Sequence, residues 1–192
     1  MSSDGTLALV EQAFVAHFGH SPVRASVSFV GVAPIEVLRF EPIPGERAYL
    51  TLGMSRDPMT AASASIQSAD GPRAELMLHI TDPTDQFADV WRQVAVLAAA
   101  PAVEGVVYTA GMTIDLGQAL VPGSACTGAV MTPSAVESVS TPTGPVEILL
   151  VNPATQNELA WARVRGGAEL VARWSEQATP LLDLRRAQAD LS

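Results

Sequence analysis

Residues 143–174, TGPVEILLVNPATQNELAWARVRGGAELVARW, constrain the fold more than any other part of the chain. Val146–Val151 is an apolar run that only Glu147 interrupts. Such a run is typical of a strand covered on both faces, although its short length leaves a helix open as an alternative. Asn152 and Pro153 follow directly and are expected to end the strand.

Two helices are predicted after this strand. Thr155 stands three residues before Glu158, the spacing of a capping box that satisfies free amide groups at a helix start. Gly166 is expected to end the first helix, because glycine adopts positive backbone φ values without steric cost. A second helix is expected to begin at Ala168 and to carry Trp174 on its apolar side. This pattern is specific for a fold, but it contains no arrangement of residues for catalysis.

The composition indicates a folded domain and excludes several classes of function. The chain has 192 residues, of which 48% are hydrophobic, so it can form one domain with a core over residues 1–192. Its net charge is −9, and none of its 11 basic residues lies between Gln93 and Ala162. It therefore lacks the basic surface that a nucleic-acid partner needs. An acidic surface suits either ordinary solubility or a basic protein partner.

The sequence also lacks the usual signals for export and membrane insertion. No apolar stretch reaches the roughly 20 residues that cross a bilayer, and no basic segment precedes an apolar one near the N-terminus. We therefore expect a cytoplasmic protein without a membrane partner. The single cysteine, Cys126, excludes an internal disulfide. The absence of lysine and the abundance of alanine suggest a GC-rich bacterial source.

The remaining periodicities predict an N-terminal helix, a series of strands and a central helix. Apolar residues recur at helical spacing over residues 6–18, after a cap at Asp4. The central helix is expected to begin at a cap formed by Asp82 and to end at Pro101. Strands are predicted over residues 23–30, 35–40, 48–54, 74–80, 113–116 and 129–131.

The central helix is expected to pack on the sheet and to bury much of Trp91. Its apolar stripe, Val90, Val94 and Leu97, should cover a sheet face that contains Leu76, Leu78, Ile148 and Leu150. In the strand over residues 74–80, the face with Leu76, Leu78 and Ile80 is expected to meet the core, and His79 is expected on the other face. The segment 57–72 is rich in alanine and serine, which indicates a mobile connection between strands rather than a binding site.

No catalytic motif is present. Cys126 would act as a nucleophile only if folding brought a histidine close to it, and a small buried hydrophobic role is more typical. His17, His20 and His79 do not have the spacing of metal ligands. We therefore expect no catalytic residue, no metal site and no cofactor.

Several segments occur in a characteristic order between Ile35 and Arg186. They are YLTLGMS (49–55), RAELMLHI (73–80), the helix with Trp91, GMTIDL (111–116), residues 141–171 with NELAWAR and GGAELV, and LLDLRR (181–186). This order resembles that of the suppressor of fused family over residues 35–186. The resemblance implies an α+β domain, in which a mixed, largely antiparallel sheet is flanked by helices, and it implies a role without catalysis.

The same resemblance implies a protein-binding function. The animal protein holds a short peptide of Gli transcription factors as an added strand between two lobes, whereas this chain has the length of the N-terminal lobe alone. Met112 stands where the animal protein has an acidic residue that helps hold the peptide, so Gli binding is not implied. Some bacterial members have been proposed as immunity proteins that neutralise toxins. An unrecognised hydrolase and a structural subunit of a larger assembly stay open as alternatives.

The partner-binding residues suggested by the resemblance are Met112, Ile114 and Asp115. They lie in or beside a short strand between Gly111 and Gly117, and short strands bracketed by glycines often lie at sheet edges that accept another strand. Asp115 is expected to face solvent and to favour a basic protein partner. The alternative is an internal strand in which Met112 fills the core. The oligomeric state is left open.

Overall fold

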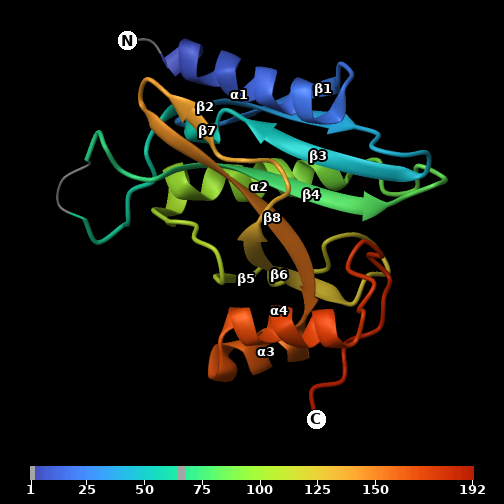
Figure 1. Ribbon diagram of the computed structural model, residues 1–192. Helices are drawn as coiled ribbons and strands as arrows, with labels where there is room; N and C mark the ends of the chain where they lie inside the picture. Colours follow the sequence, from blue (N-terminus) through green and yellow to red (C-terminus); the bar gives the residue numbers. More distant parts are fainter. Residues whose placement is uncertain (1–2, 65–67) are drawn as a thin grey trace.

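The computed structural model describes residues 3–64 and 68–192. Within these ranges the chain forms one mixed, eight-stranded sheet with helices on both faces (Figure 1). The helices are α1 (Ser3–Phe18), α2 (Val90–Glu104), α3 (Gln156–Arg165), α4 (Gly167–Glu176) and the short 3-10 helix η1 (Met54–Arg56). The strands are β1 (Val23–Phe29), β2 (Val32–Phe40), β3 (Glu46–Leu52), β4 (Arg73–Thr81), β5 (Thr113–Asp115), β6 (Cys126–Pro133), β7 (Val139–Thr141) and β8 (Gly144–Thr155). The expected α+β class is confirmed.

The sheet runs in the order β1-β2-β3-β4-β8-β6-β5, and β7 pairs with β8 outside this path. All neighbours are antiparallel except β4 and β8, which are parallel. β1 and β5 therefore form the two edges of the sheet, while β4 and β8 lie at its centre. The short strand β7 was not predicted from the sequence.

The central strands are buried on both faces. On β4, Leu76, Leu78 and Ile80 face the core under α2, whereas Met77 belongs to the core under α1. The face predicted to meet the core is therefore confirmed, but the opposite face also packs on a core, which was not predicted. Its alternation reflected two different cores rather than a core and solvent.

The register of β8 differs from the expected one by one residue. Leu149 and Val151 belong to the core under α2, whereas Ile148 and Leu150 pack into the core under α1. Because successive strand side chains point to opposite faces, a shift of one residue moves each side chain to the other face. A strand that is buried on both faces does not alternate between polar and apolar residues, so its sequence does not show which side chains point to which face.

β8 also continues through Asn152 and Pro153 to Thr155, so its expected end is wrong. The ladder between β4 and β8 ends at Leu150, and beyond it β8 pairs with β6 alone. Proline is tolerated in a strand where its missing amide faces an unpaired side. Here that side is occupied by Arg186, which donates to the Pro153 carbonyl oxygen at 2.9 Å.

The limits of α2 are the second major difference from expectation. The helix begins at Val90 and not directly after Asp82, and Asp85 has a left-handed backbone (φ 54°) that no α-helix can contain. The Asp82 carboxylate caps a turn instead and accepts bonds from the amides of Gln86 and Phe87. At its other end, α2 passes through Pro101 and stops at Glu104.

The C-terminal helix pair follows the predicted pattern. Thr155 and Glu158 form both bonds of the capping box at the start of α3. Gly166 has a φ of 99° between α3 and α4, a conformation that favours glycine. The segment 57–72 is held at several points, including bonds from Met59 N to Pro72 O and from Ala62 N to Gly105 O. The segment was expected to be mobile, and part of it, residues 65–67, lies outside the described residues.

Candidate functional site at the β5 edge

β5 forms one edge of the sheet and pairs only with β6 within the described ranges. The Met112 carbonyl oxygen accepts a bond from Met131 N, and Leu116 N donates to Thr127 O. Backbone groups of alternate residues on an antiparallel strand point to the same side. The amide and carbonyl groups of Thr113 and Asp115 therefore point away from β6, where another strand can pair with them.

The side chains of this edge divide between two faces. Met112, Ile114 and Leu116 are partly buried and pack against the core under α2. Asp115 lies on the opposite face and is exposed beside α3. Figure 1 shows β5 between α2 and the α3–α4 pair. Met112 thus contributes to the core as the alternative interpretation expected, although it lies next to an open edge.

Asp115 is bound within its own chain. Its Oδ2 accepts bonds from Arg163 at 2.8 Å and from Gln156 at 3.4 Å, and its Oδ1 accepts one from the amide of Gly117. The Gly117 amide and the Arg163 guanidinium lower the pKa of this carboxyl group. Arg163 and Gln156 were not predicted as site residues. They lie seven residues apart on α3, a spacing that places both on one helix face.

Two glycines allow α3 and α4 to lie close to this edge. A Cβ atom at Gly128 on β6 would come within 2.6 Å of Leu159 Cδ1 on α3, and one at Gly167 on α4 within 2.1 Å of the Gly111 carbonyl oxygen. The double glycine between the helices therefore has two roles, since Gly166 adopts a positive φ and Gly167 permits this close approach.

A buried ion pair fixes the helices that support the site. Glu158 and Arg186 have side chains that are 0% and 1% exposed, and they are joined by two bonds of 2.7 and 2.8 Å. Glu158 also accepts bonds from the Trp174 indole and from the amides of Thr155 and Ala189. One carboxylate therefore joins the start of α3, the last turn of α4 and the C-terminal segment.

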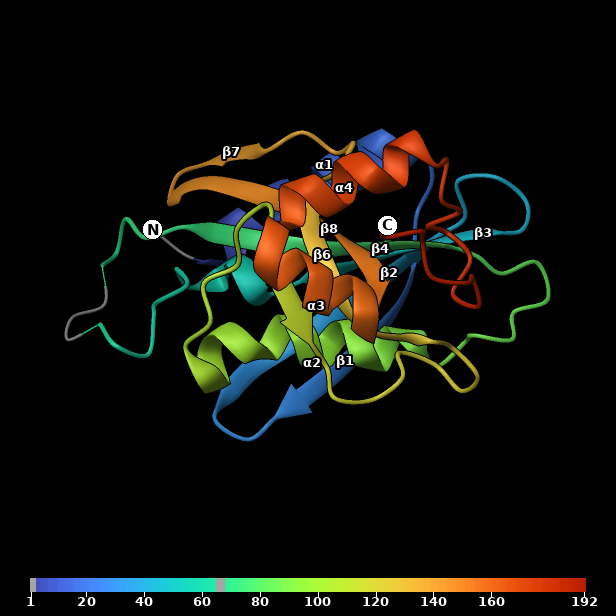
Figure 2. The same cartoon turned by 90° about the horizontal axis from the view of Figure 1, so that it is seen from below.

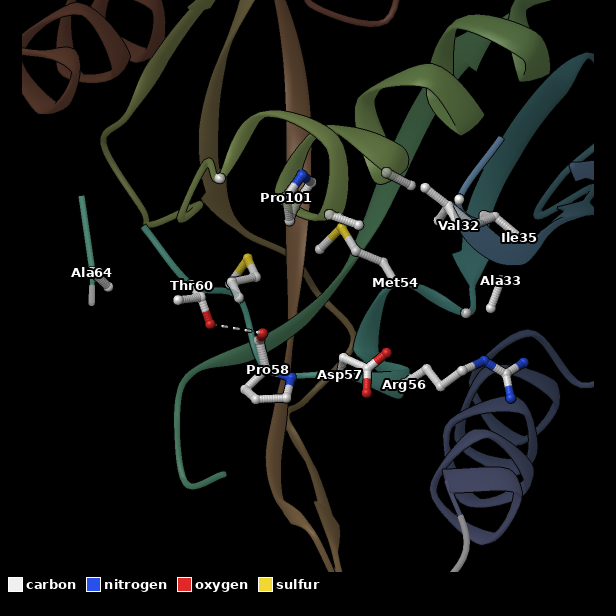
Figure 3. Close-up of a pocket in the computed structure, with 16 residues that line it drawn as sticks. Val32, Ala33, Ile35, Met54, Arg56, Asp57, Pro58, Thr60, Ala64 and Pro101 are labelled. Carbon is white, nitrogen blue, oxygen red and sulfur yellow. Dashed lines mark hydrogen bonds between the residues drawn. The ribbon is translucent and has the colours of Figure 1, made fainter. Parts of the chain in front are cut away.

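A separate pocket of about 520 Å³ lies between the start of β2, η1 and the end of α2 (Figure 3). Small and apolar residues form most of its wall, and Asp57 and Thr60 are among its few polar side chains. Arg56 extends toward α1, where it pairs with Asp4 at 3.2 Å. Among the described residues no histidine or cysteine lines the pocket, and the Thr60 hydroxyl donates to the Pro58 carbonyl oxygen at 3.5 Å and not to Asp57, so the wall shows no nucleophile bonded to a base.

The geometry does not favour Cys126 as a nucleophile. Its side chain is buried, and burial raises the pKa of its thiol, which disfavours the reactive thiolate. The Ser124 hydroxyl accepts a bond from the Cys126 amide at 3.0 Å, whereas His79 lies on β4 and pairs with Glu46 on β3, so no histidine of the described residues is a partner of Cys126. Over residues 3–64 and 68–192, no group of three or more histidine, cysteine or acidic residues is placed to hold a metal ion.

Fold and edge together define a class of α+β domain with an open sheet edge supported by a helix pair. The sequence profile of the Suppressor of fused protein (SUFU) family matches residues 31–187. The chain therefore belongs to the suppressor of fused family. No relative among curated proteins matches the sequence. Among the helices of the described residues, none is long and apolar enough to cross a membrane.

Solved structures show the same fold at low sequence identity. A SUFU homologue from Neisseria gonorrhoeae has a TM-score of 0.70 and 15% identity, with 96% of this chain and 97% of that chain covered. Drosophila Suppressor of Fused has a TM-score of 0.71 and 14% identity, but only 51% of that chain is covered. A crystal structure of the Sufu–Fu complex has a TM-score of 0.70 and 14% identity, with 95% and 91% covered.

Proposed function

We propose that this protein is a non-catalytic binding module that holds an extended segment of a partner protein at the β5 edge. The observation that carries the proposal is the outer side of β5, which no strand of residues 3–64 or 68–192 pairs with, so that the backbone groups of Thr113 and Asp115 are available to an added strand. Membership of a family with a protein complex among its solved structures supports the same role.

The ion pair of Asp115 changes the expected chemistry of the partner. A basic side chain arriving at this carboxylate must compete with Arg163, which is already bound to it. Backbone pairing along β5 therefore supplies most of the affinity, and the charge of Asp115 has a smaller role. The apolar groups of Met112 and Ile114 favour a partner strand with apolar residues on the side of α2.

Proline at position 113 tests the proposal. Thr113→Pro removes one outward amide while the bonds of Met112 and Leu116 to β6 stay in place. Thr113→Val keeps the amide and serves as the matched control. Each variant and the wild type would be used to capture partners from the native host, with identification by mass spectrometry. We expect Thr113→Val to retain the partner and Thr113→Pro to lose it. Equal capture by both variants would contradict binding at this edge.

The finer proposal is that the partner is a protein toxin and that the chain is its immunity protein. It is supported by the acidic net charge of −9 and by the lack of a nucleophile paired with a base in the described sites. Co-expression with the captured partner should restore growth of cells that the partner alone inhibits. A captured partner without any effect on growth would leave the binding module but exclude the immunity role.

A further inference from the structure

The second edge of the sheet has a residue pattern that complements itself. β1 (Val23–Phe29) pairs only with β2 within the described residues, and Figure 2 shows it at the rim of the molecule. Its seven-residue edge contains no proline or lysine, and edges of this kind readily accept another strand. We propose that β1 pairs with β1 of a second copy of this chain in an antiparallel, two-fold arrangement.

The two faces of β1 differ in polarity. Val27 and Phe29 lie on the face of α2 and pack against its core, and Val23 and Ala25 line a hollow of about 160 Å³ with Trp91. The opposite face carries Arg24, Ser26 and Ser28, all of which are exposed. In a two-fold pairing, apolar residues meet apolar residues only if the apolar face of one β1 lies on the same side as the apolar face of the other.

A register centred on Ser26 meets this condition and uses the whole strand. It places Val23 opposite Phe29 of the second copy and Ala25 opposite Val27, so apolar residues face apolar residues. It also places Arg24 opposite Ser28, so no like charges meet. A register centred on Arg24 would place two arginines opposite each other, which disfavours it.

The remaining surface is compatible with this pairing. Val23 is 62% exposed in the single chain, and an aromatic ring opposite it would come beside the hollow that contains Trp91. Arg24 forms ion pairs with Glu11 and Glu36 of its own chain, and these carboxylates offset its positive charge where the two β1 strands would meet. Because each chain has a net charge of −9, the two copies repel each other at long range. We therefore expect a reversible dimer that strengthens as salt is added.

The register can be tested with two variants of identical charge. Ser26→Glu places two carboxylates opposite each other across the two-fold axis, whereas Ser28→Glu places a carboxylate opposite Arg24 of the second copy. Sedimentation velocity over a range of protein concentrations would give the dimer Kd of each. We expect Ser26→Glu to weaken the dimer and Ser28→Glu to maintain or tighten it, with a difference in Kd of about tenfold.

Two results would overturn the proposal. One is a wild-type chain that stays monomeric up to about 1 mM at moderate salt, where weak association is still visible. The other is an equal change of Kd in both variants, which add the same charge; because Ser26 lies opposite Glu36 of its own chain, the Kd of each variant is compared only where its β1 is intact. Melting curves would establish that both variants are folded. The β5 edge lies at the other end of the sheet, so partner capture with Ser26→Glu separates this proposal from the proposed function.

Discussion

The hydroxyl group of Tyr108 donates a hydrogen bond to the carbonyl oxygen of Leu97 at 2.8 Å. In a regular α-helix this carbonyl would accept a bond from the amide of residue 101, but Pro101 has none. Tyr108 thus replaces the bond that the proline removes. This contact supports the continuation of α2 beyond Pro101. It comes from a residue outside the helix, so the capping and proline signals of the helix sequence could not predict it.

Loss of this hydroxyl should destabilise the protein in a way that depends on Pro101. Tyr108→Phe leaves the Leu97 carbonyl without a partner in a buried place, and we expect a loss of about 1–3 kcal/mol. In a Pro101→Ala background, the new amide can bond Leu97, so the same substitution should cost clearly less. Urea unfolding of the four proteins gives this coupling. Equal losses in both backgrounds would show that the hydroxyl does not substitute for the amide.

The buried pair of Glu158 and Arg186 should make stability depend on pH. Burial raises the pKa of Glu158, but bonds from Arg186 and from the amides of Ala189 and Thr155 outweigh it, so the net pKa lies below the ordinary 4.5. The folded pKa is depressed, so this contribution is complete above pH 4.5 and is lost as the pH falls through the folded value. Glu158→Gln should cost about 3–5 kcal/mol at neutral pH and less in acid. Urea unfolding at several pH values measures this, with the exposed Glu147→Gln as the control.

Gly167 should tolerate no side chain, in contrast to Gly5. Gly167→Ala would place a Cβ atom 2.1 Å from the Gly111 carbonyl oxygen, so α4 or the start of β5 must move. We expect a loss of about 1–3 kcal/mol or more in the free energy of unfolding. Gly5→Ala in α1 meets nothing within 4 Å and should stabilise the helix by about 0.5–1 kcal/mol. Thermal melts of the two variants that shift in the same direction would contradict this packing.

The two tryptophans expected in the core should differ in their contribution. Trp174 is 1% exposed and bonds Glu158 through its indole, whereas Trp91 is only partly buried beside Arg92. We expect Trp174→Ala to cost about 3–5 kcal/mol, and Trp91→Ala to cost less. Chemical unfolding of both variants measures the difference. A larger loss for Trp91→Ala would mean that the core under α2 depends on this ring more than its exposure indicates.

Local signals in the sequence predicted local structure. The capping box of Thr155 and Glu158, the turn at Gly166 and the positions of most strands follow from residues close together in the chain. Features that depend on distant residues were missed or wrong. Which β8 side chains face which side of the sheet depends on two cores formed by distant residues. The continuation of β8 through Pro153 involves Arg186 from the C-terminal segment.

The candidate site shows the same division. The edge position of the strand around Ile114 was expected from its short length and flanking glycines, and the sheet order places it there. The ion pair between Asp115 and Arg163 was not expected, because it joins residues from β5 and α3 that only the folded sheet brings together. Its presence changed the chemistry expected of a partner, although the role of this edge in binding stays a prediction.

The parallel pairing of β4 and β8 has a consequence for how this chain folds. Arg73 lies opposite Val146, so the whole segment from β4 through α2, β5, β6 and β7 must close as a loop before these central strands meet. Closing such a loop costs chain entropy before any contact rewards it, and non-local pairings of this kind slow folding. During synthesis, the strands β1–β4 emerge first and must wait for β8 to complete both cores. We therefore expect the apolar faces of β4 to be the part of the newly made chain that most needs protection from aggregation.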